Sequence, residues 1–304
     1  MSFDLTPGDD LRQIIDAAQA MLDSHYPVAR LQEGMGGDDL SPLEEFGAFA
    51  LALPEDAGGA GFTLVEEAHL HVALGRHLVG PAALATAIAR RLDAGVTACI
   101  GIEGDGPWTL IDPAGADHAV VRVEGGFGLA PIAEPDAADA LGAGLPAAKM
   151  ARAGANRPVD ADLARLLTAA QLLGVATGAR DLAVDYAKIR EQFGQPIGTF
   201  QAIKHHAANM TLGIESVSAL LDVAAIALRD GHADAGFQIA ALTRLAPRVA
   251  LENARIGVQI HGGIGFSAEA NAHLYLKQAH ALRQFIGAGD IMAHAAPLAP
   301  YDEA

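Results

Sequence analysis

The sequence predicts a mainly α-helical protein with a small β domain in its middle. Two observations indicate this fold class. Apolar residues recur at helical spacing near both ends of the chain, whereas the segment between them contains short runs of strand-like composition. Glycine-rich turns separate these short runs, as expected of strands in a small sheet. We therefore expect an N-terminal helical domain over 1–95, a truncated β domain over 96–150 and a C-terminal four-helix bundle over 151–304.

The first helices of the N-terminal domain follow from periodicity and capping signals. Residues 9–24 place apolar side chains on one helical face. The stretch Ser41-Pro42-Leu43-Glu44 is typical of a capping box with proline at the first helical position. Thr63-Leu64-Val65-Glu66 predicts a second capping box and a helix that runs to about His77.

Glycine and proline mark the breaks between these helices. Residues 53–61 contain three glycines and a proline, so we expect a loop there. Gly80-Pro81 predicts another break, followed by a helix to about Leu92.

The middle segment reads as a small β region. Gly104-Asp105-Gly106-Pro107 and Gly125-Gly126 are turn signals between strand-like runs. The region is too short for a full barrel, so a meander is the simplest expectation, and the Ala/Gly/Pro-rich residues 133–157 are left unassigned. The predicted strands are 96–102, 108–112, 119–124 and 127–132.

The remainder of the chain predicts long helices with wide apolar faces. Such faces are typical of a four-helix bundle, and they leave surface for contacts between subunits. Pro247 is expected to kink or interrupt the third helix, because proline lacks the backbone donor that a helix needs. The predicted helices lie near 158–190, 199–230, 234–260 and 268–293.

Composition limits the classes of function. The net charge of −17 argues against a nucleic-acid or anionic-membrane partner, because either would require a basic surface. Cys99 is the single cysteine, so no disulfide within the chain can form. The first residues lack the features of a signal peptide, and no uninterrupted apolar run reaches membrane-spanning length. We expect a cytoplasmic protein.

Two motifs contain residues suited to binding a phosphorylated ligand. Arg190 and Phe193 lie three residues apart at a predicted helix end, which would place a guanidinium and a ring on one side. Gly262 and Gly263 would let backbone N–H groups approach a phosphate or an amide. Taken singly, each motif is better explained by an ordinary helix end or an interhelical turn.

The order and spacing of these motifs resemble the acyl-CoA dehydrogenase family of flavoproteins. Residues 190–194 (Arg-Glu-Gln-Phe-Gly) are similar to the family's Arg-x-x-Phe-Gly helix ending, and Gln201-Ala202 to the start of its next helix. Residues 259–266 match its Gln-x-x-Gly-Gly-x-Gly-Phe loop. Upstream, segments between Leu53 and Arg76 resemble its N-terminal domain.

This resemblance implies a fold and a cofactor. The family has an N-terminal helical domain, a middle β domain and a C-terminal four-helix bundle, with FAD at a subunit interface. The motifs above hold the adenosine and pyrophosphate end of a neighbouring subunit's FAD. Gln192 departs from the family pattern, where a threonine or similar small polar residue is common. By resemblance, the cofactor-binding residues are Arg190, Gln192, Phe193, Gln201, Gln259, Gly262 and Gly263.

The resemblance also exposes a missing catalytic base. Family members desaturate a CoA thioester with a carboxylate that removes the α-proton. Ile286 occupies one family position for this carboxylate, and Ala164 occupies the alternative position, beside Arg165, which resembles a retained arginine of the substrate region. Neither Ile286 nor Ala164 can take a proton. Asp162 and Asp290 lie near these positions in sequence, but helical geometry disfavours both as substitutes.

Residues that hold a subunit's own flavin are also absent. We find neither the family's Thr-Glu-x-x-x-Gly-Ser-Asp stretch nor a convincing Trp-x-Thr element at Trp108-Thr109. Ala288 and Asp290 stand where a threonine and a glutamine are usual. The chain keeps the residues that serve a neighbour's flavin and lacks those that serve its own.

With this selective loss of residues, the chain resembles the small, base-lacking subunit of heterotetrameric, steroid-CoA type acyl-CoA dehydrogenases. The implied partners are a longer subunit with the catalytic glutamate, an acyl-CoA substrate and an electron acceptor. Two alternatives stay open. In the first, the chain is a homo-oligomer that binds flavin or CoA without dehydrogenation. In the second, it is a homo-oligomeric dehydrogenase that uses an atypical base.

Other reactive residue types predict no further site. His205 and His206 are adjacent on a helix and diverge by about 100°, so they do not suit one metal ion. His261 is more simply a packing residue, and His273 and His280 lack a nearby carboxylate. Cys99 lies in a strand-like run and is expected to be buried rather than nucleophilic.

Overall fold

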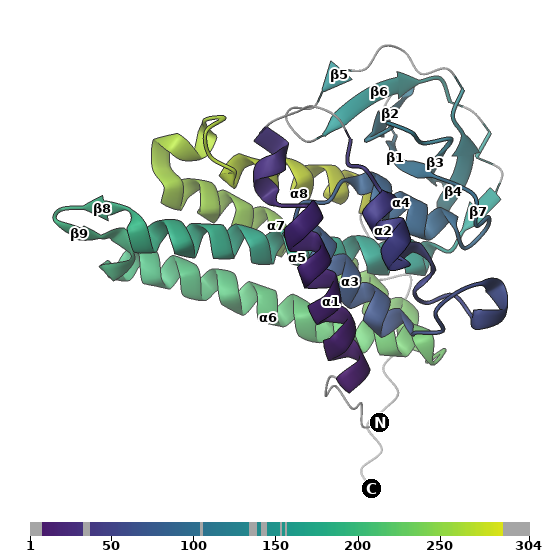
Figure 1. Cartoon of the computed structure of the whole chain (residues 1–304), viewed down its shortest axis with the longest axis horizontal. Helices are drawn as coiled ribbons and strands as arrows, with labels where there is room; N and C mark the ends of the chain where they lie inside the picture. The colour runs from purple at the N-terminus through teal and green to yellow at the C-terminus, as the bar shows by residue number, and fades with distance from the viewer. Residues whose placement is uncertain are drawn as a thin grey trace, which may run out of the picture.

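The computed structural model confirms the predicted fold class. It describes residues 8–32, 37–103, 106–133, 139–140, 145–152, 154–155 and 157–287. Long helices form the body of the molecule, a curved sheet lies beside one part of it, and shorter N-terminal helices pack against both (Figure 1).

The N-terminal helices form where the periodicity and break signals place them. Helix α3 ends at Arg76, one residue before the expected His77. The expected loop over 53–61 contains only a single short turn of 3₁₀-helix, Glu55–Ala57. The four helices are α1 (Asp9–His25), α2 (Ser41–Phe46), α3 (Leu64–Arg76) and α4 (Pro81–Ala89).

Of the two predicted capping boxes, one is confirmed and one is wrong. At α3, the Thr63 hydroxyl accepts from the backbone N–H of Val65, and the Glu66 carboxylate accepts from the N–H of Thr63 at 2.8 Å. Ser41 instead lies inside α2, because the Asp39 carboxylate accepts from both its backbone N–H and its hydroxyl. Glu44, the expected partner in the box, forms an ion pair with Arg90 at 2.6 Å.

The middle region is a seven-stranded sheet in the order β5-β6-β2-β1-β3-β4-β7. The sheet is no simple meander, because β1 pairs in parallel with β3. Three strands, β5, β6 and β7, fall in or near the stretch that the sequence left unassigned, and β7 extends the sheet to Val159. The strands are β1 (Ala98–Ile102), β2 (Trp108–Ile111), β3 (His118–Val123), β4 (Gly126–Pro131), β5 (Asp139–Ala140), β6 (Pro146–Met150) and β7 (Arg157–Val159).

The bundle consists of α5 (Ala161–Ile189), α6 (Gln201–Arg229), α7 (Ala235–His261) and α8 (Ala272–Ile286). A hairpin of β8 (Glu191–Gln192) and β9 (Gln195–Pro196) and a 3₁₀ turn (Ile197–Thr199) join α5 to α6. Helix α8 ends at Ile286, because Gly287 adopts a left-handed φ of 71°. The rest of the expected fourth helix, 288–293, lies outside the described residues.

Pro247 does not interrupt α7, which is continuous across it. Proline removes one backbone donor, so the bond to the carbonyl of Thr243 is lost. Its neighbours Ala246, Val249 and Ala250 are all buried in the bundle, and this packing holds the helix together.

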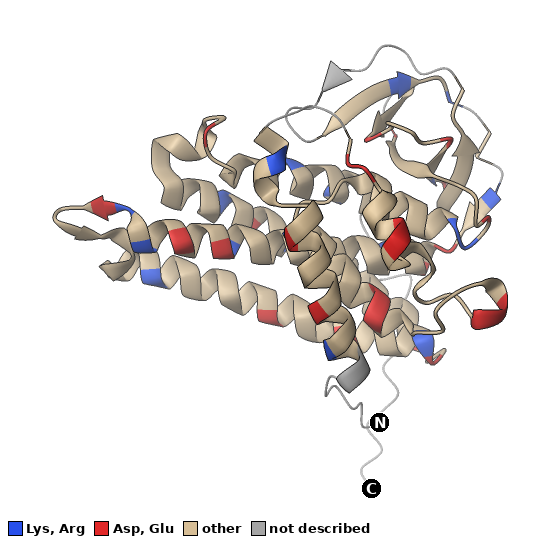
Figure 2. Ribbon diagram, in the orientation of Figure 1, with Lys and Arg blue, Asp and Glu red and all other residues tan. Residues whose placement is uncertain are grey.

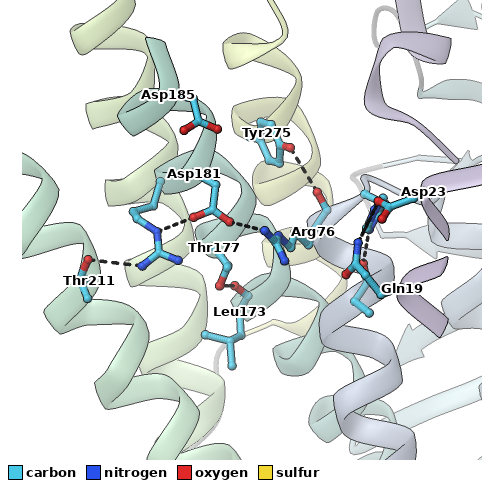
Figure 3. A network of polar contacts seen from close by, with 12 residues as sticks. Gln19, Asp23, Arg76, Leu173, Thr177, Asp181, Asp185, Thr211 and Tyr275 are labelled. Atoms are coloured by element: carbon cyan, nitrogen blue, oxygen red, sulfur yellow. Dashed lines mark hydrogen bonds and ion pairs between the residues drawn. The ribbon is translucent and has the colours of Figure 1, made fainter. Parts of the chain in front are cut away.

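Glycines allow α3 to lie very close to α5. A Cβ on Gly75 would overlap the carbonyl of Gln171, and one on Gly174 would overlap the carbonyl of Val72. Next to this crossing, Asp181 pairs with Arg76 at 2.8 Å and with Arg180 at 2.7 Å (Figure 3). One apolar core then runs through the N-terminal helices, one face of the sheet and the bundle.

Helix α6 has the length and hydropathy of a membrane span, with a mean hydropathy of 1.7 over its most apolar window. In the structure this helix packs within the bundle against α5 and α7. Its composition therefore serves helix packing here.

Candidate functional site

One pocket at the end of the bundle collects four of the seven predicted cofactor-binding residues. It has a volume of about 530 Å³ and lies between the end of α5, the β8–β9 hairpin and the turn that follows α7. In Figure 1 the hairpin projects from the left end of the bundle. The predicted residues that line this pocket are Arg190, Gln192, Gly262 and Gly263.

Arg190 is the residue at which α5 stops. Its backbone turns to an extended conformation, with φ −75° and ψ 122°, and its carbonyl accepts from Ile197 at 2.8 Å. The chain therefore leaves the helix before Phe193, and the two residues do not share a helix face as their spacing predicted. Phe193 instead occupies the hairpin turn with a φ of 52°, followed by Gly194 at 78°.

The glycine loop presents an open backbone to the pocket. Gly262 has a φ of 65°, and a Cβ at either Gly262 or Gly263 would meet nothing within 4 Å. Gly265 is different, because a Cβ there would lie 2.6 Å from the carbonyl oxygen of Val258. The first two glycines leave room for a ligand, and the third lets the turn fold onto α7.

Sequence reasoning missed Tyr186 as a pocket residue. Its ring stacks on the ring of His261, with centroids 4.3 Å apart and planes 20° from parallel. His261 is buried and bonded through Nδ1 to the carbonyl of Gly257 at 2.7 Å, so it packs, as expected. The signal was present in the sequence: Tyr186 lies one helical turn before Arg190, on the same face.

The other three predicted cofactor residues lie outside the lining of this pocket. Gln201 is the first residue of α6, and Gln259 lies in the last turn of α7; both are exposed. Phe193 is 92% exposed, and its ring packs edge to face with that of Phe200 at a centroid distance of 6.0 Å. These side chains face solvent at the same end of the bundle as the pocket.

Exposed apolar side chains gather around this end. Ile189 is 77% exposed and Phe266 is 76% exposed, and each flanks one side of the pocket. Large apolar residues left in water at adjoining positions are typical of a surface that another protein covers. The pocket therefore lies within a candidate interface.

The donor set of the pocket suits a diphosphate. Arg190 is exposed and forms no ion pair with any residue that the structure describes. A free guanidinium fork beside an open glycine backbone offers charged and neutral N–H donors together. Figure 2 shows basic and acidic segments alternating around the hairpin and the adjoining ends of α5 and α6.

Both positions expected for a catalytic base are buried in the apolar core. Ala164 is 0% exposed and Ile286 is 2% exposed, and both belong to the cluster that contains Phe127 and Phe285. The two phenyl rings pack with centroids 5.2 Å apart. A carboxylate in this environment would lack any compensating partner among these side chains.

Arg165 and Asp162 pair with each other. Their side chains approach to 3.3 Å, and the guanidinium lies 5.9 Å from the centroid of the Phe127 ring. The buried Nε of Arg165 has no hydrogen-bond partner among the described residues. Asp162 is thus engaged with Arg165, while Asp290 and Ala288 lie outside the described residues.

The sheet residues singled out earlier take structural roles. Trp108 is buried with Cys99 in the smaller cluster of the sheet, on the face away from the bundle. Burial raises the pKa of the Cys99 thiol well above its usual range, so this cysteine is no nucleophile. Thr109 faces an apolar pocket of about 420 Å³ between the sheet and α8, with Lys277 and His280 at its edge.

No group of three or more potential metal ligands occurs among the residues with described positions. His205 and His206 lie at the start of α6, and neither belongs to such a group.

Comparison with known proteins places these features in a family. Residues 160–296 match the family described as acyl-CoA dehydrogenase, C-terminal domain. The chain is 31% identical to acyl-CoA dehydrogenase IpdE2 of Mycobacterium tuberculosis, over 93% of this chain and 94% of that protein.

Solved structures share the fold. A chain of the Tcur3481-Tcur3483 steroid ACAD G363A variant superposes with a TM-score of 0.75 at 24% identity, over 95% of this chain and 96% of that one. A chain of the ChsE4-ChsE5 complex from Mycobacterium tuberculosis gives 0.73 at 21% identity, over 96% of each. At these identities the likeness concerns the fold alone.

Proposed function

This chain belongs to the acyl-CoA dehydrogenase family, and we propose that it is the base-lacking subunit of an FAD-dependent heteromer. In this proposal a longer family member supplies the catalytic glutamate. The present chain supplies contacts to the adenosine and pyrophosphate end of the FAD that the partner holds. An α2β2 heterotetramer is the arrangement we infer.

One contrast carries the proposal. The pocket with Arg190 and Gly262 is open, charged and surrounded by exposed apolar side chains. The positions of Ile286 and Ala164 are closed and apolar. A chain that had simply lost its function would not be expected to keep the open, charged pocket while apolar residues occupy the two base positions.

The chemistry divides between the two subunits. Bound FAD supplies the hydride acceptor for α,β-desaturation of a CoA thioester. In this chain, Arg190 would pair with the pyrophosphate, and the backbone of Gly262 and Gly263 would lie against it. Gln192 lines the same pocket, and Phe193, Gln201 and Gln259 would contact the cofactor once the partner covers this end of the bundle. The proton at the substrate α-carbon would go to the partner's carboxylate, since Ile286 cannot accept it.

The substrate class comes from relatives. The IpdE2 protein is named as an acyl-CoA dehydrogenase, and one structural neighbour is described as a steroid ACAD. We propose a CoA thioester with a bulky, steroid-like acyl group. An electron acceptor that reoxidises the flavin and a cytoplasmic location complete the proposal.

The first experiment measures flavin content and native mass. The chain is purified alone and then after co-expression with a longer homologue that carries glutamate at the position of Ile286. We expect little flavin absorbance from the chain alone, and FAD with the mass of a tetramer from the pair. A yellow homo-oligomer with a full complement of FAD would overturn the proposal and favour a homo-oligomeric flavoprotein.

Arg190 provides the sharper test within the complex. We expect Arg190→Ala to weaken FAD retention by about tenfold or more, because a charge-assisted bond to the pyrophosphate is lost. The amount of FAD that stays with the complex through dialysis measures this effect. Arg229→Ala is the matched control, since Arg229 pairs with Asp230 at the far end of α6. Equal flavin content in both variants would contradict the assigned role of Arg190.

A further inference from the structure

A second charged pocket lies between α7 and the end of α8. It has a volume of about 360 Å³, and four of its nine lining residues are arginines. It shares no lining residue with the pocket of Arg190. The four arginines are Arg244, Arg248, Arg255 and Arg283.

These side chains converge because of helical spacing. Arg244, Arg248 and Arg255 are separated by four and seven residues, so they follow one face of α7. Arg283 comes from the last turn of α8. Arg122 of β3 adds a fifth guanidinium, since its side chain lies against Gly287 at the edge of the pocket.

No described residue forms an ion pair with these arginines. None of the five guanidinium groups forms an ion pair or a hydrogen bond within the part of the chain that the structure describes. Several other arginines are paired, such as Arg30 with Asp38 and Arg229 with Asp230. The chain has a net charge of −17, so carboxylates are not scarce.

The pocket therefore holds an excess of positive charge. Glu252 is its one carboxylate, and it can offset only one of the four guanidinium charges. The pKa of nearby His280 is lowered first by burial and then by the charges of Arg255 and Arg283. Like charges at helical spacing repel one another, so a bound anion would stabilise this arrangement.

We propose that the arginine pocket binds the phosphate groups of a small phosphorylated ligand. The planar guanidinium fork matches phosphate oxygens in pairs, and several forks around one cavity suit a diphosphate better than a single phosphate. The volume lies in the range of small-molecule sites. A concave pocket of this size favours a small ligand over the acidic surface of another protein. This site is independent of the FAD contacts proposed above.

Calorimetric titration of the full chain with inorganic pyrophosphate at 0.15 M salt tests this site. The pocket of Arg190 also suits a diphosphate, so every chain in this titration carries Arg190→Gln. In that background we expect one binding event, and we expect it to weaken by about a hundredfold in the Arg248→Gln/Arg255→Gln double variant, or about tenfold for each charge-assisted pair lost. All three arginines are exposed, so thermal melting should show intact folding.

Two results would overturn the proposal. These are no binding of pyrophosphate in the Arg190→Gln background, and equally tight binding in that background by the Arg248→Gln/Arg255→Gln double variant. Sulfate at equal ionic strength is the control for general charge screening. Flavin content of the double variant in the complex distinguishes this site from the FAD contacts: it should stay at the wild-type level.

Discussion

Asp112 shows how a single backbone conformation can bury a carboxyl group. The residue follows β2 with a left-handed φ of 59°, and its side chain lies beneath the first turn of α4. Its carboxylate accepts from the backbone N–H of Ala82 at 3.2 Å. Burial is the main cause that raises its pKa to about 7, with the charge of Asp38 adding to the shift and that of Arg30 opposing it.

This shift predicts a dependence of stability on pH. Because the pKa of Asp112 is raised in the folded state, its stabilising contribution is complete below about pH 4 and is lost as the pH rises through about 7. Asparagine keeps the acceptor for Ala82 and tolerates the left-handed φ, but never ionises. We expect Asp112→Asn to raise the free energy of unfolding by on the order of 1–3 kcal/mol at pH 8, with a smaller gain at pH 5.

Urea denaturation at the two pH values measures this difference, and Asp39→Asn is the opposite-sign control. Hydrogen bonds from Ser41 lower the pKa of the exposed Asp39, so its contribution is present at neutral pH and is lost as the pH falls through that lowered pKa. An Asp112→Asn gain that did not grow with pH would contradict the assignment.

At this scale, sequence reasoning succeeded where a local signal had no competitor. Thr63 and Glu66 form the predicted capping box. The same pattern failed at Ser41, because Asp39, two residues earlier, supplies a charged acceptor that the pattern did not consider. The helical spacing of Arg190 and Phe193 failed because α5 ends at Ile189, a boundary decided by the hairpin that follows.

At the scale of elements, the crossing of α3 and α5 depends on small residues. The backbone or a ring of the neighbouring helix lies directly against each of three glycines, Gly75, Gly174 and Gly178. A Cβ at Gly178, for example, would lie 2.8 Å from the carbonyl oxygen of Arg76. Sequence patterns predicted both helices but not this contact. The periodicity of apolar residues does not predict which neighbouring helix a glycine within a helix will contact.

The close crossing predicts that one added methyl group will lower the free energy of unfolding substantially. We expect Gly174→Ala to lower the free energy of unfolding by about 3 kcal/mol, because its Cβ would overlap the Val72 carbonyl and separate two rigid helices. Gly257→Ala is the matched control, since its nearest neighbour there, the carbonyl oxygen of Ala179, would be 3.4 Å away. The control should change stability by no more than about 1 kcal/mol, through helix propensity. Equal denaturation midpoints would contradict the close crossing.

The sheet shows a second limit of prediction from elements. Strands β1 to β4 form from the short strand-like runs, bounded by glycine-rich turns, that predicted them. Strand β6, Pro146–Met150, is rich in alanine and starts with proline, so it has little intrinsic tendency to extend. It forms because β2 provides a partner along four residue pairs. The strand is a product of tertiary pairing, which a local pattern does not contain.

For the whole molecule, the hairpin turn offers a way to separate folding from assembly. Phe193 adopts a left-handed φ of 52°, which is unfavourable for an aromatic residue, and its ring is 92% exposed. Asparagine is favoured in this conformation and suits a hairpin turn followed by Gly194. A purely structural role would therefore let Phe193→Asn stabilise the chain.

We expect Phe193→Asn to keep or raise the thermal stability of the isolated chain while it weakens assembly with the partner by about tenfold. Burying an aromatic ring at an interface typically contributes more than 1 kcal/mol. Sedimentation of the mixed subunits measures assembly. Leu92→Asn, which alters a partly exposed leucine far from the hairpin in sequence, is the control. Unchanged assembly by Phe193→Asn would remove the hairpin from the proposed interface.

The glycine crossing also sets the order in which the nascent chain can fold. Residues that meet there, such as His71 and Gln171, lie 100 positions apart in the sequence. A ribosome adds about 5–20 residues per second, so α3 waits roughly 5–20 s for the helix that covers it. During that interval the apolar faces of α3 and α4 have no α5 to cover them, and the entire sheet is synthesised before they close. The N-terminal helices therefore complete their packing only after α5 has been synthesised.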